Sequence, residues 1–332
     1  MKKYLIFRTD RIGDFIVSCI LINSIKRNEN NSHITVVCSK KNYNYIKGVS
    51  LVDEAILYPE NILERIRFYF YLKKKNFDVS LALDGKKKSI YSSLFSLPKK
   101  KFLNTTKLVY KFIFFPLFTK IFYIKDYKSR LDEIKSILKV LNFNYLQEDL
   151  NIFKNKDFFI KNNRNKHVLE NSYNLFHFDE KWIDGQYIKK FTSIQPNIND
   201  LIIFLKKIIS KTNLNLIIST GNIKTKYINE LQNTFNIDQN KNYKIDFNGK
   251  KIYLLNNLSF IELKYIISKS KLIITCHGSP THVASSMNVR IIDIYEEKSK
   301  EFYFFWNSHL RNYKFLYREK FELLSEKIIS LL

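Results

Sequence analysis

The residue best suited to chemistry stands close to the start of the chain. An apolar run at residues 4–7 leads into Arg8, Gly13 and Asp14, after which apolar residues recur at helical spacing. This order predicts a short strand, a turn permitted by Gly13, and a helix that begins beside Asp14. Ligands of open α/β sheets bind at the carboxyl ends of strands, so Asp14 is a candidate general base. The alternative is an acidic residue placed for the helix dipole.

A second candidate site follows the apolar run at residues 272–275, which predicts a buried strand. Ser279 and Pro280 then predict a helix, with Ser279 as N-cap and the proline at the first helical position. The free N–H groups of such a helix start suit a phosphate or pyrophosphate. A helix-packing role is the alternative for His282 in the first turn. The expected phosphate-binding residues of this loop are His277, Gly278, Ser279 and His282.

Together these motifs resemble glycosyltransferase family 9, the bacterial ADP-heptose:lipopolysaccharide heptosyltransferases. The family's R-x-D-R-I-G-D pattern matches residues 8–14, and its strand, D-T-G-x-x-H loop, helix and next strand resemble residues 271–295. Weaker blocks lie between them at residues 78–89, 179–182 and 220–221. The resemblance therefore spans roughly residues 1–295 in order.

The resemblance implies an α/β protein of GT-B type, with two doubly wound Rossmann-like domains facing a central cleft. It implies an inverting transfer of heptose or a related sugar from a nucleotide sugar such as ADP-heptose, without metal or cofactor. The acceptor would be an anionic glycolipid, namely lipopolysaccharide or another surface glycan. In this scheme Asp14 is the catalytic base, and Lys181 supplies positive charge to the departing diphosphate.

Some residues keep two interpretations. Arg8 and Arg11, with Gly13 on the acceptor side, would bind an acceptor phosphate or carboxylate, or else brace the turn by pairing with Asp10. Lys181 has the alternative of an ordinary surface lysine.

The loop at His277 departs from the family pattern, which has an aspartate at this position. The replacement removes an acceptor and introduces a group that is neutral or cationic. Recognition of the donor sugar is therefore expected to differ from that of the family. A non-catalytic nucleotide- or glycan-binding relative is the second function compatible with this loop.

Composition supports an ordinary globular protein of two domains, because the chain has 332 residues, 45% of them hydrophobic. Its three scattered cysteines give no disulfide framework and suggest a reducing compartment. Only seven glycines are present, without a G-x-G-x-x-G or P-loop pattern, which disfavours dinucleotide dehydrogenases and P-loop NTPases. No Cys/His spacing typical of zinc is found.

The formal net charge of +25 suggests attraction to anionic partners. Residues 107–125 mix lysines with bulky apolar side chains, and this segment either lies in a membrane interface or is buried with its lysines extended to solvent. Neither a signal peptide nor a membrane-spanning run is apparent, so the expected location is the cytoplasm, in solution or at the cytoplasmic face of the inner membrane. A basic adaptor for membranes or nucleic acid is the third and weakest function, and specific nucleic-acid binding is not expected.

Strand-like and helical patterns alternate along the chain, which predicts parallel sheets with right-handed crossovers. The expected domains are residues 1–155 for the acceptor, residues 172–300 for the nucleotide sugar, and a helical segment at 301–332 that packs back toward the first domain. The polar stretch 151–171 is the expected boundary. The predicted strands are residues 4–7, 34–38, 79–83, 174–178, 214–219, 251–255, 272–275 and 291–295.

Overall fold

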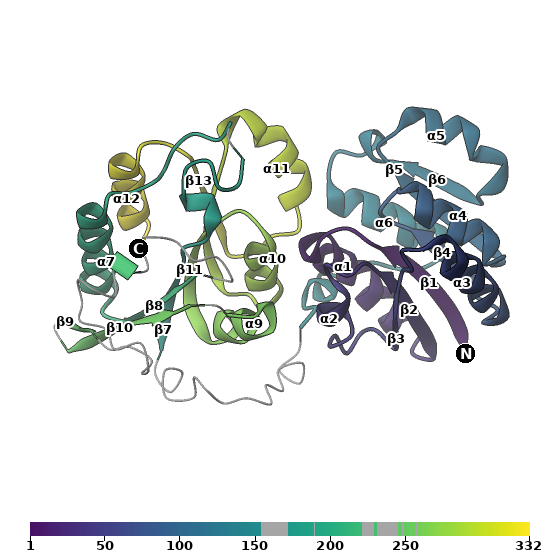
Figure 1. Ribbon diagram of the computed structural model, residues 1–332, viewed down its shortest axis with the longest axis horizontal. Coiled ribbons are helices and arrows are strands. Elements are labelled where there is room, and N and C mark those ends of the chain that lie inside the picture. The colour runs from purple at the N-terminus through teal and green to yellow at the C-terminus, as the bar shows by residue number, and fades with distance from the viewer. Residues whose placement is uncertain (154–171, 189, 221–228, 231–244, 248, 257) are drawn as a thin grey trace. The chain divides into compact units, whose positions relative to one another are not determined.

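The computed structural model describes residues 1–153, 172–188, 190–220, 229–230, 245–247, 249–256 and 258–332 (Figure 1). The chain divides into two compact units. Unit 1 comprises Met1–Asp157 and Phe304–His309, and unit 2 comprises Phe158–Tyr303 and Leu310–Leu332. Most of the expected linker at 151–171 lies outside the described residues.

Unit 1 is built on a parallel sheet with the strand order β3-β2-β1-β4-β5-β6. The order reverses direction beside β1, which is the arrangement of a doubly wound sheet. Its elements are β1 (Lys2–Arg8), α1 (Ile12–Asn28), β2 (Ser32–Cys38), α2 (Tyr43–Ile46), β3 (Glu54–Leu57), α3 (Ile62–Lys74), β4 (Val79–Ala82), α4 (Lys87–Phe95), β5 (Lys100–Thr105), α5 (Leu108–Ile113), η1 (Phe115–Leu117), β6 (Lys120–Tyr123), η2 (Ile124–Asp126), α6 (Arg130–Val140) and η3 (Gln147–Leu150).

Unit 2 contains a second sheet with the order β13-β12-β11-β7-β8-β10-β9, parallel except for β9. Its elements are β7 (Tyr173–His177), η6 (Glu180–Trp182), α7 (Ile198–Thr212), β8 (Asn215–Ser219), β9 (Ile245–Phe247), β10 (Lys250–Leu255), α9 (Phe260–Lys269), β11 (Ser270–Cys276), α10 (Ser279–Ser286), β12 (Arg290–Tyr295), η7 (Glu297–Ser299), α11 (Lys300–Asn307), β13 (Tyr313–Tyr317) and α12 (Phe321–Ser330).

All eight strands expected from the sequence are present, within a few residues of the predicted bounds. The strands β3, β5, β6, β9 and β13 were not expected. The segment 107–125 is one source of this difference, because it contains the edge strand β6 after α5 and η1. Short edge strands carry no long apolar run, so their pattern is weak.

The helices form where capping and apolar spacing agree. Ser259 and Glu262 make a capping box at the start of α9. Helix α6 begins after its N-cap Ser129, whose side chain accepts a hydrogen bond from the N–H of Asp132. Helix α1 is buried on all sides from Phe15 to Ile22, because it lies on the sheet and also contacts α2 and α6.

The last segment of the chain divides between the units, whereas residues 301–332 were expected to pack toward the first domain. Phe304–His309 groups with unit 1, but β13 and α12 belong to unit 2. The apolar face of α12 accounts for this placement, because Phe321, Leu324 and Ile328 join the core of unit 2 around Trp182. No helix in the described part of the chain is long and apolar enough to cross a bilayer.

Candidate active site

Asp14 lies in the first turn of α1, directly beyond the carboxyl end of β1. Gly13 is also helical and does not have a positive φ, so the predicted glycine turn at this position is wrong. The chain passes from strand to helix through Thr9, Asp10 and Arg11, the N-cap of α1. Burial raises the pKa of the Asp14 carboxyl, and the positive charge of Arg8 offsets part of that effect. A carboxylate with a raised pKa is a better general base than an exposed one.

Arg8 is almost completely buried at the end of β1. Its Nε donates to the Ser18 hydroxyl over 2.6 Å, and its Nη1 forms an ion pair with Asp10 over 2.7 Å. The bracing role that the sequence left open is therefore present. Arg11, by contrast, is exposed.

A second buried arginine, which the sequence analysis missed, lies at the same site. Arg130 begins α6 and pairs with the buried carboxylate of Glu133, which also accepts a hydrogen bond from the Asn104 amide. The guanidinium of Arg130 stacks over the ring of Trp306 at 4.9 Å. The charged groups of Arg130 and Glu133 are thus each oriented by at least one neighbouring side chain.

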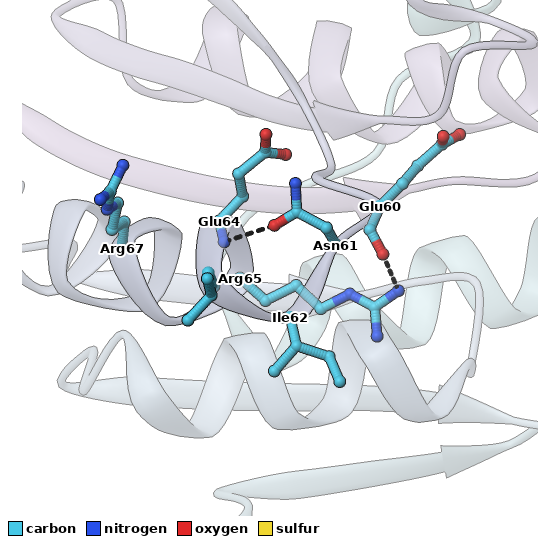
Figure 2. A pocket seen from close by; sticks show the side chains of 7 residues that line it. Glu60, Asn61, Ile62, Glu64, Arg65 and Arg67 are labelled. Carbon is cyan, nitrogen blue, oxygen red and sulfur yellow. Dashed lines mark hydrogen bonds between the residues drawn. The ribbon is translucent and has the colours of Figure 1, made fainter.

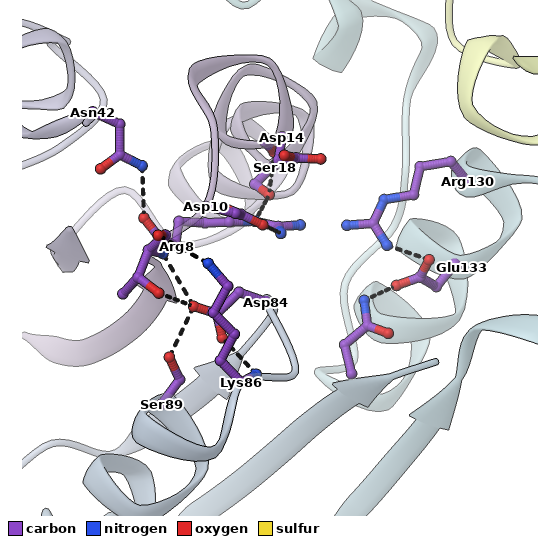
Figure 3. A network of polar contacts seen from close by, with 12 residues as sticks. Arg8, Asp10, Asp14, Ser18, Asn42, Asp84, Lys86, Ser89, Arg130 and Glu133 are labelled. Atoms are coloured by element: carbon purple, nitrogen blue, oxygen red, sulfur yellow. Dashed lines mark hydrogen bonds and ion pairs between the residues drawn. The ribbon is translucent and has the colours of Figure 1, made fainter. Parts of the chain in front are cut away.

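The guanidinium groups of Arg8 and Arg130 point toward one another, with Asp14 nearby (Figure 3). Among the described residues, Nη2 of Arg8 and Nε of Arg130 have no hydrogen-bond partner. Buried donors without a partner are costly, and in native proteins they usually have a ligand or a functional role. The arrangement can hold an anionic group beside the Asp14 carboxylate.

Asp84 completes the carboxyl edge of this sheet. Its Oδ2 accepts hydrogen bonds from the hydroxyl of Thr9 at 2.6 Å and from the hydroxyl of Ser89 at 2.8 Å. Lys86 donates to the Thr9 carbonyl at 3.0 Å. The block at residues 78–89 therefore fixes the β1–α1 segment (Figure 3).

In unit 2 the loop before α10 differs from the expectation in one detail. The N-cap is Gly278 with φ 172°, and Ser279 is already the first helical residue. A Cβ on Gly278 would lie 3.0 Å from Nζ of Lys181, so this glycine allows the lysine to approach the loop. Lys181 and the start of α10 therefore meet, although they are far apart in sequence.

Lys181 is held in place by Asp179, since its Nζ lies 2.5 Å from Oδ2 of that buried carboxylate. Burial alone would lower the pKa of Lys181, but the charge of Asp179 raises it overall, so the lysine stays cationic. Arg318 donates to the Lys181 carbonyl at 2.9 Å and fixes the backbone here. These contacts contradict the interpretation of Lys181 as an ordinary surface lysine.

His277 is oriented by a buried carboxylate that the sequence analysis did not identify. Its Nδ1 lies 2.6 Å from Oδ2 of Asp293 on β12, and Asp293 also accepts hydrogen bonds from the hydroxyls of Thr281 and Tyr313. The rings of His277 and His282 are 5.3 Å apart in an edge-to-face arrangement. An acidic side chain is thus still present at this loop, contributed by the neighbouring strand.

His177 is a further buried group near Lys181. Burial lowers its pKa to about 4, although Asp179 at 3.6 Å acts in the opposite direction. Its Nδ1 contacts the Ser219 hydroxyl at 2.9 Å, and its carbonyl accepts a hydrogen bond from the Trp182 indole at 3.0 Å. Because its pKa is lowered, the His177 imidazole is neutral at neutral pH.

Two shallow hollows in the described structure lie away from these residues. One is at the first turn of α3 and includes Glu60, Ile62 and Arg67 (Figure 2), and the other is between α7 and α12. Neither contains a site residue expected from the sequence. In the described residues no group of three or more His, Cys, Asp or Glu side chains is placed to hold a metal ion.

The chain matches no protein-family model and no curated protein sequence. Its fold is nevertheless that of known structures. A glycosyl transferase family 9 protein from Veillonella parvula has a TM-score of 0.66 at 14% identity, covering 99% of this chain and 88% of its own. ADP-heptose lps heptosyltransferase II of E. coli has 0.66 at 13% identity, covering 100% and 98%. E. coli heptosyltransferase WaaC, solved with ADP, has 0.64 at 12% identity, covering 99% and 97%.

These matches span almost the whole length of both chains, whereas the sequence motifs cover separate blocks. The predicted fold class is therefore confirmed: the chain has the GT-B fold found in the heptosyltransferase structures of glycosyltransferase family 9.

Proposed function

We propose that this protein is a glycosyltransferase of family 9 type that moves a heptose or related sugar from a nucleoside diphosphate donor to an acceptor hydroxyl. The observation that carries the proposal is the half-buried Asp14 at the carboxyl edge of the first sheet, beside two oriented arginines. The fold shared with heptosyltransferases supports the same reaction class.

Asp14 would take the proton of the acceptor hydroxyl as its oxygen attacks the anomeric carbon. A carboxylate is a weak base for an alcohol, so proton transfer comes late, when the hydroxyl has become acidic. Attack from the side opposite the leaving diphosphate inverts the anomeric centre. The free N–H groups of Arg8 and Arg130 support an acceptor with an acidic group near that hydroxyl, such as the sugar acids or phosphates of a surface glycolipid.

The donor diphosphate would bind at the start of α10 and at Lys181. The N–H groups of the first helical turn and the lysine both favour negative charge that develops on the leaving group. We propose that this charge is sufficient without a divalent ion. Asp293 would then perform, through His277, the donor-side role that the family assigns to the aspartate of the loop.

The test is a thermal-shift screen against ADP, UDP, GDP and CMP and their common sugar conjugates, repeated in EDTA. We expect selective stabilisation by a nucleoside diphosphate and its sugar, unchanged by the chelator. Stabilisation by no nucleotide would refute the donor site. The non-catalytic alternative predicts nucleotide binding without release of diphosphate when anionic glycolipid acceptors are added.

The role of the loop is tested by His277→Asp alone and together with Asp293→Asn. In the single variant the new carboxylate at position 277 would lie beside the buried carboxylate of Asp293. The two negative charges would repel each other, so we expect weaker donor binding. The double variant removes that repulsion and restores the family's arrangement, so it should recover the binding. Equal behaviour of the two variants would contradict the assignment of Asp293.

A further inference from the structure

Exposed apolar side chains are concentrated on one part of unit 1. Of 25 large hydrophobic side chains exposed in the described residues, 14 lie between residues 62 and 117. They belong to α3, α4 and α5 and to the residues that follow these helices. We name this set the outer face: Ile62, Leu63, Ile66, Phe70, Tyr71, Tyr91, Phe95, Leu97, Leu108, Val109, Phe112, Ile113, Phe115 and Leu117.

The three helices cover the same side of the sheet. Phe68 of α3, Ile90 of α4 and Tyr110 of α5 join one core cluster with residues of the strands. The rings of Tyr69 and Phe95 stack at 5.0 Å and connect α3 with α4. Because the buried sides of α3, α4 and α5 face the same sheet, their exposed sides point away from it. Figure 1 shows these three helices in unit 1.

Hydrogen bonds close the turn that presents Ile62 and Leu63 of the outer face. At the start of α3 the Asn61 side chain accepts a hydrogen bond from the N–H of Glu64 at 2.7 Å, and Arg65 donates to the Glu60 carbonyl at 2.6 Å (Figure 2). Leu63, in this turn, is 73% exposed. On η1, Phe115 is also 73% exposed. A solvated protein surface rarely holds so many aromatic and aliphatic groups together without a partner.

The charge of the chain segment that carries the outer face indicates which partner this is. Residues 61–128 contain 16 Lys and Arg but only four Asp and Glu, a net charge of +12 out of +25 for the whole chain. Three of the four acids are already engaged: Asp78 pairs with Lys99, Asp126 with Lys111, and Asp84 accepts the bonds of Thr9 and Ser89. Two copies of so basic a face would repel each other, whereas an anionic bilayer would attract it.

We propose that the outer face docks on the surface of an anionic lipid bilayer. Exposed residues such as Phe112 and Phe115 would enter the interfacial region, while Arg67, Lys107 and neighbouring basic residues contact the headgroups. Helices α3, α4 and α5 each begin at the carboxyl edge of the sheet, where Asp14 and Asp84 lie. Docking does not depend on the proposed transferase activity, but it would bring that edge close to a lipid-linked acceptor.

The test is co-sedimentation of the full chain with vesicles of phosphatidylcholine, with and without about 30% phosphatidylglycerol. We expect binding to the anionic vesicles that weakens steeply between about 0.1 M and about 0.5 M NaCl. Phe112→Ser/Phe115→Ser should lose roughly tenfold or more in vesicle affinity, because both rings leave the interface. Arg67→Gln/Lys107→Gln should lose roughly fivefold for each charge removed.

Matched controls come from unit 2. Ile203→Ser/Ile261→Ser removes two exposed apolar side chains and Lys207→Gln/Lys211→Gln removes two exposed positive charges, and both variants should keep wild-type vesicle binding. Melting temperatures and the nucleotide-induced thermal shift, measured on every variant, separate loss of docking from misfolding and from failure of the proposed donor site. Equal losses in outer-face and control variants would overturn the proposal, as would wild type that ignores anionic vesicles.

A second copy of the chain is the competing occupant. Sedimentation velocity without lipid distinguishes it: we expect a monomer at low micromolar concentration. A dimer that Phe112→Ser/Phe115→Ser dissociates would assign the outer face to self-association and refute the membrane proposal.

Discussion

The carboxyl edges of the two sheets carry different kinds of charge. In unit 1 the edge holds Asp14 beside two buried arginines, one of them paired with Asp10 and the other with Glu133. In unit 2 the edge holds Lys181, which is paired with the buried Asp179, and the start of α10. The same sheet architecture thus provides a half-buried carboxylate in unit 1 and a fixed cation beside a helix start in unit 2.

This difference indicates that the acidic residues of the two edges have different roles. A carboxylate with a raised pKa can accept a proton, whereas Asp179 has its pKa lowered, chiefly by Lys181, despite its burial. Asp179 therefore serves to orient the lysine and not to move a proton. We therefore propose that unit 1 carries the chemistry and that unit 2 binds the diphosphate.

The largest expected effect tests whether Asp14 of unit 1 acts as the general base. Asp14→Asn should reduce kcat by about 10²–10⁴-fold, because a positioned general base contributes about that factor. Nucleotide affinity and melting temperature should stay unchanged. The control Asp10→Asn makes the same change four residues earlier and loses only an ion pair with Arg8, so its loss of kcat should be below about tenfold. Near-normal turnover of Asp14→Asn would exclude the assigned base.

The next effect concerns stability and pH in unit 2. Burial keeps the pKa of His177 at about 4 in the folded protein, against an ordinary value near 6.5. Between about pH 4 and about pH 6.5 His177 therefore binds a proton in the unfolded chain but stays neutral in the folded protein. As a result, the free energy of unfolding falls as the pH decreases from about 6.5 to about 4, by up to about 3 kcal/mol. Melting curves across this range should show a smaller decrease in His177→Asn. An identical pH dependence in both proteins would contradict the burial of a neutral histidine.

Removal of the positive charge of Lys181 tests whether unit 2 binds the diphosphate. Lys181→Met should weaken nucleoside diphosphate binding by about 10–100-fold, the usual contribution of a charged hydrogen bond. Lys190→Met makes the same change at an exposed lysine of the same unit and should have no effect. Because Lys181→Met also leaves Asp179 without its partner, the variant Asp179→Asn/Lys181→Met checks for misfolding: it should regain stability but not affinity. Calorimetric titration with the diphosphate measures all three variants.

The smallest effect refines the geometry of the donor loop. Gly278→Ala places a methyl group 3.0 Å from Nζ of Lys181, whose flexible end can move aside. The extended φ of Gly278 is open to alanine, so the expected loss of diphosphate affinity is only about two- to fivefold. In a Lys181→Met background the same substitution should add nothing, since the two changes act on one contact. Additive losses would show that Gly278 has another role.

The sequence was informative where long apolar runs or local signals decide structure. The strands β1, β7 and β11 and the capping box at Ser259 were predictable, because each depends on neighbouring residues. Family motifs added Asp14, Lys181 and the His277 loop. The N-cap of α10 was misplaced by one residue, since Gly278, Ser279 and Pro280 are all acceptable at a helix start.

The residues that the sequence did not reveal act through distant partners. Arg130 is unremarkable in an amphipathic helix, and only folding places it opposite Arg8. Asp293 stands in an apolar strand, and its contact with His277 depends on the pairing of β11 with β12. Nothing local distinguishes such residues from other charges in a chain with 56 Lys and Arg. Pairs of this kind become visible only in three dimensions.

The division of the last segment between the units has a consequence for synthesis on the ribosome. Unit 1 is almost complete once residue 157 has emerged, so its sheet can form early. Unit 2 has no such independence, because β13 and α12 supply an edge strand and core side chains up to Ile328. Its core closes only after Ile328 has emerged, so nascent unit 2 remains the more exposed to aggregation and proteolysis.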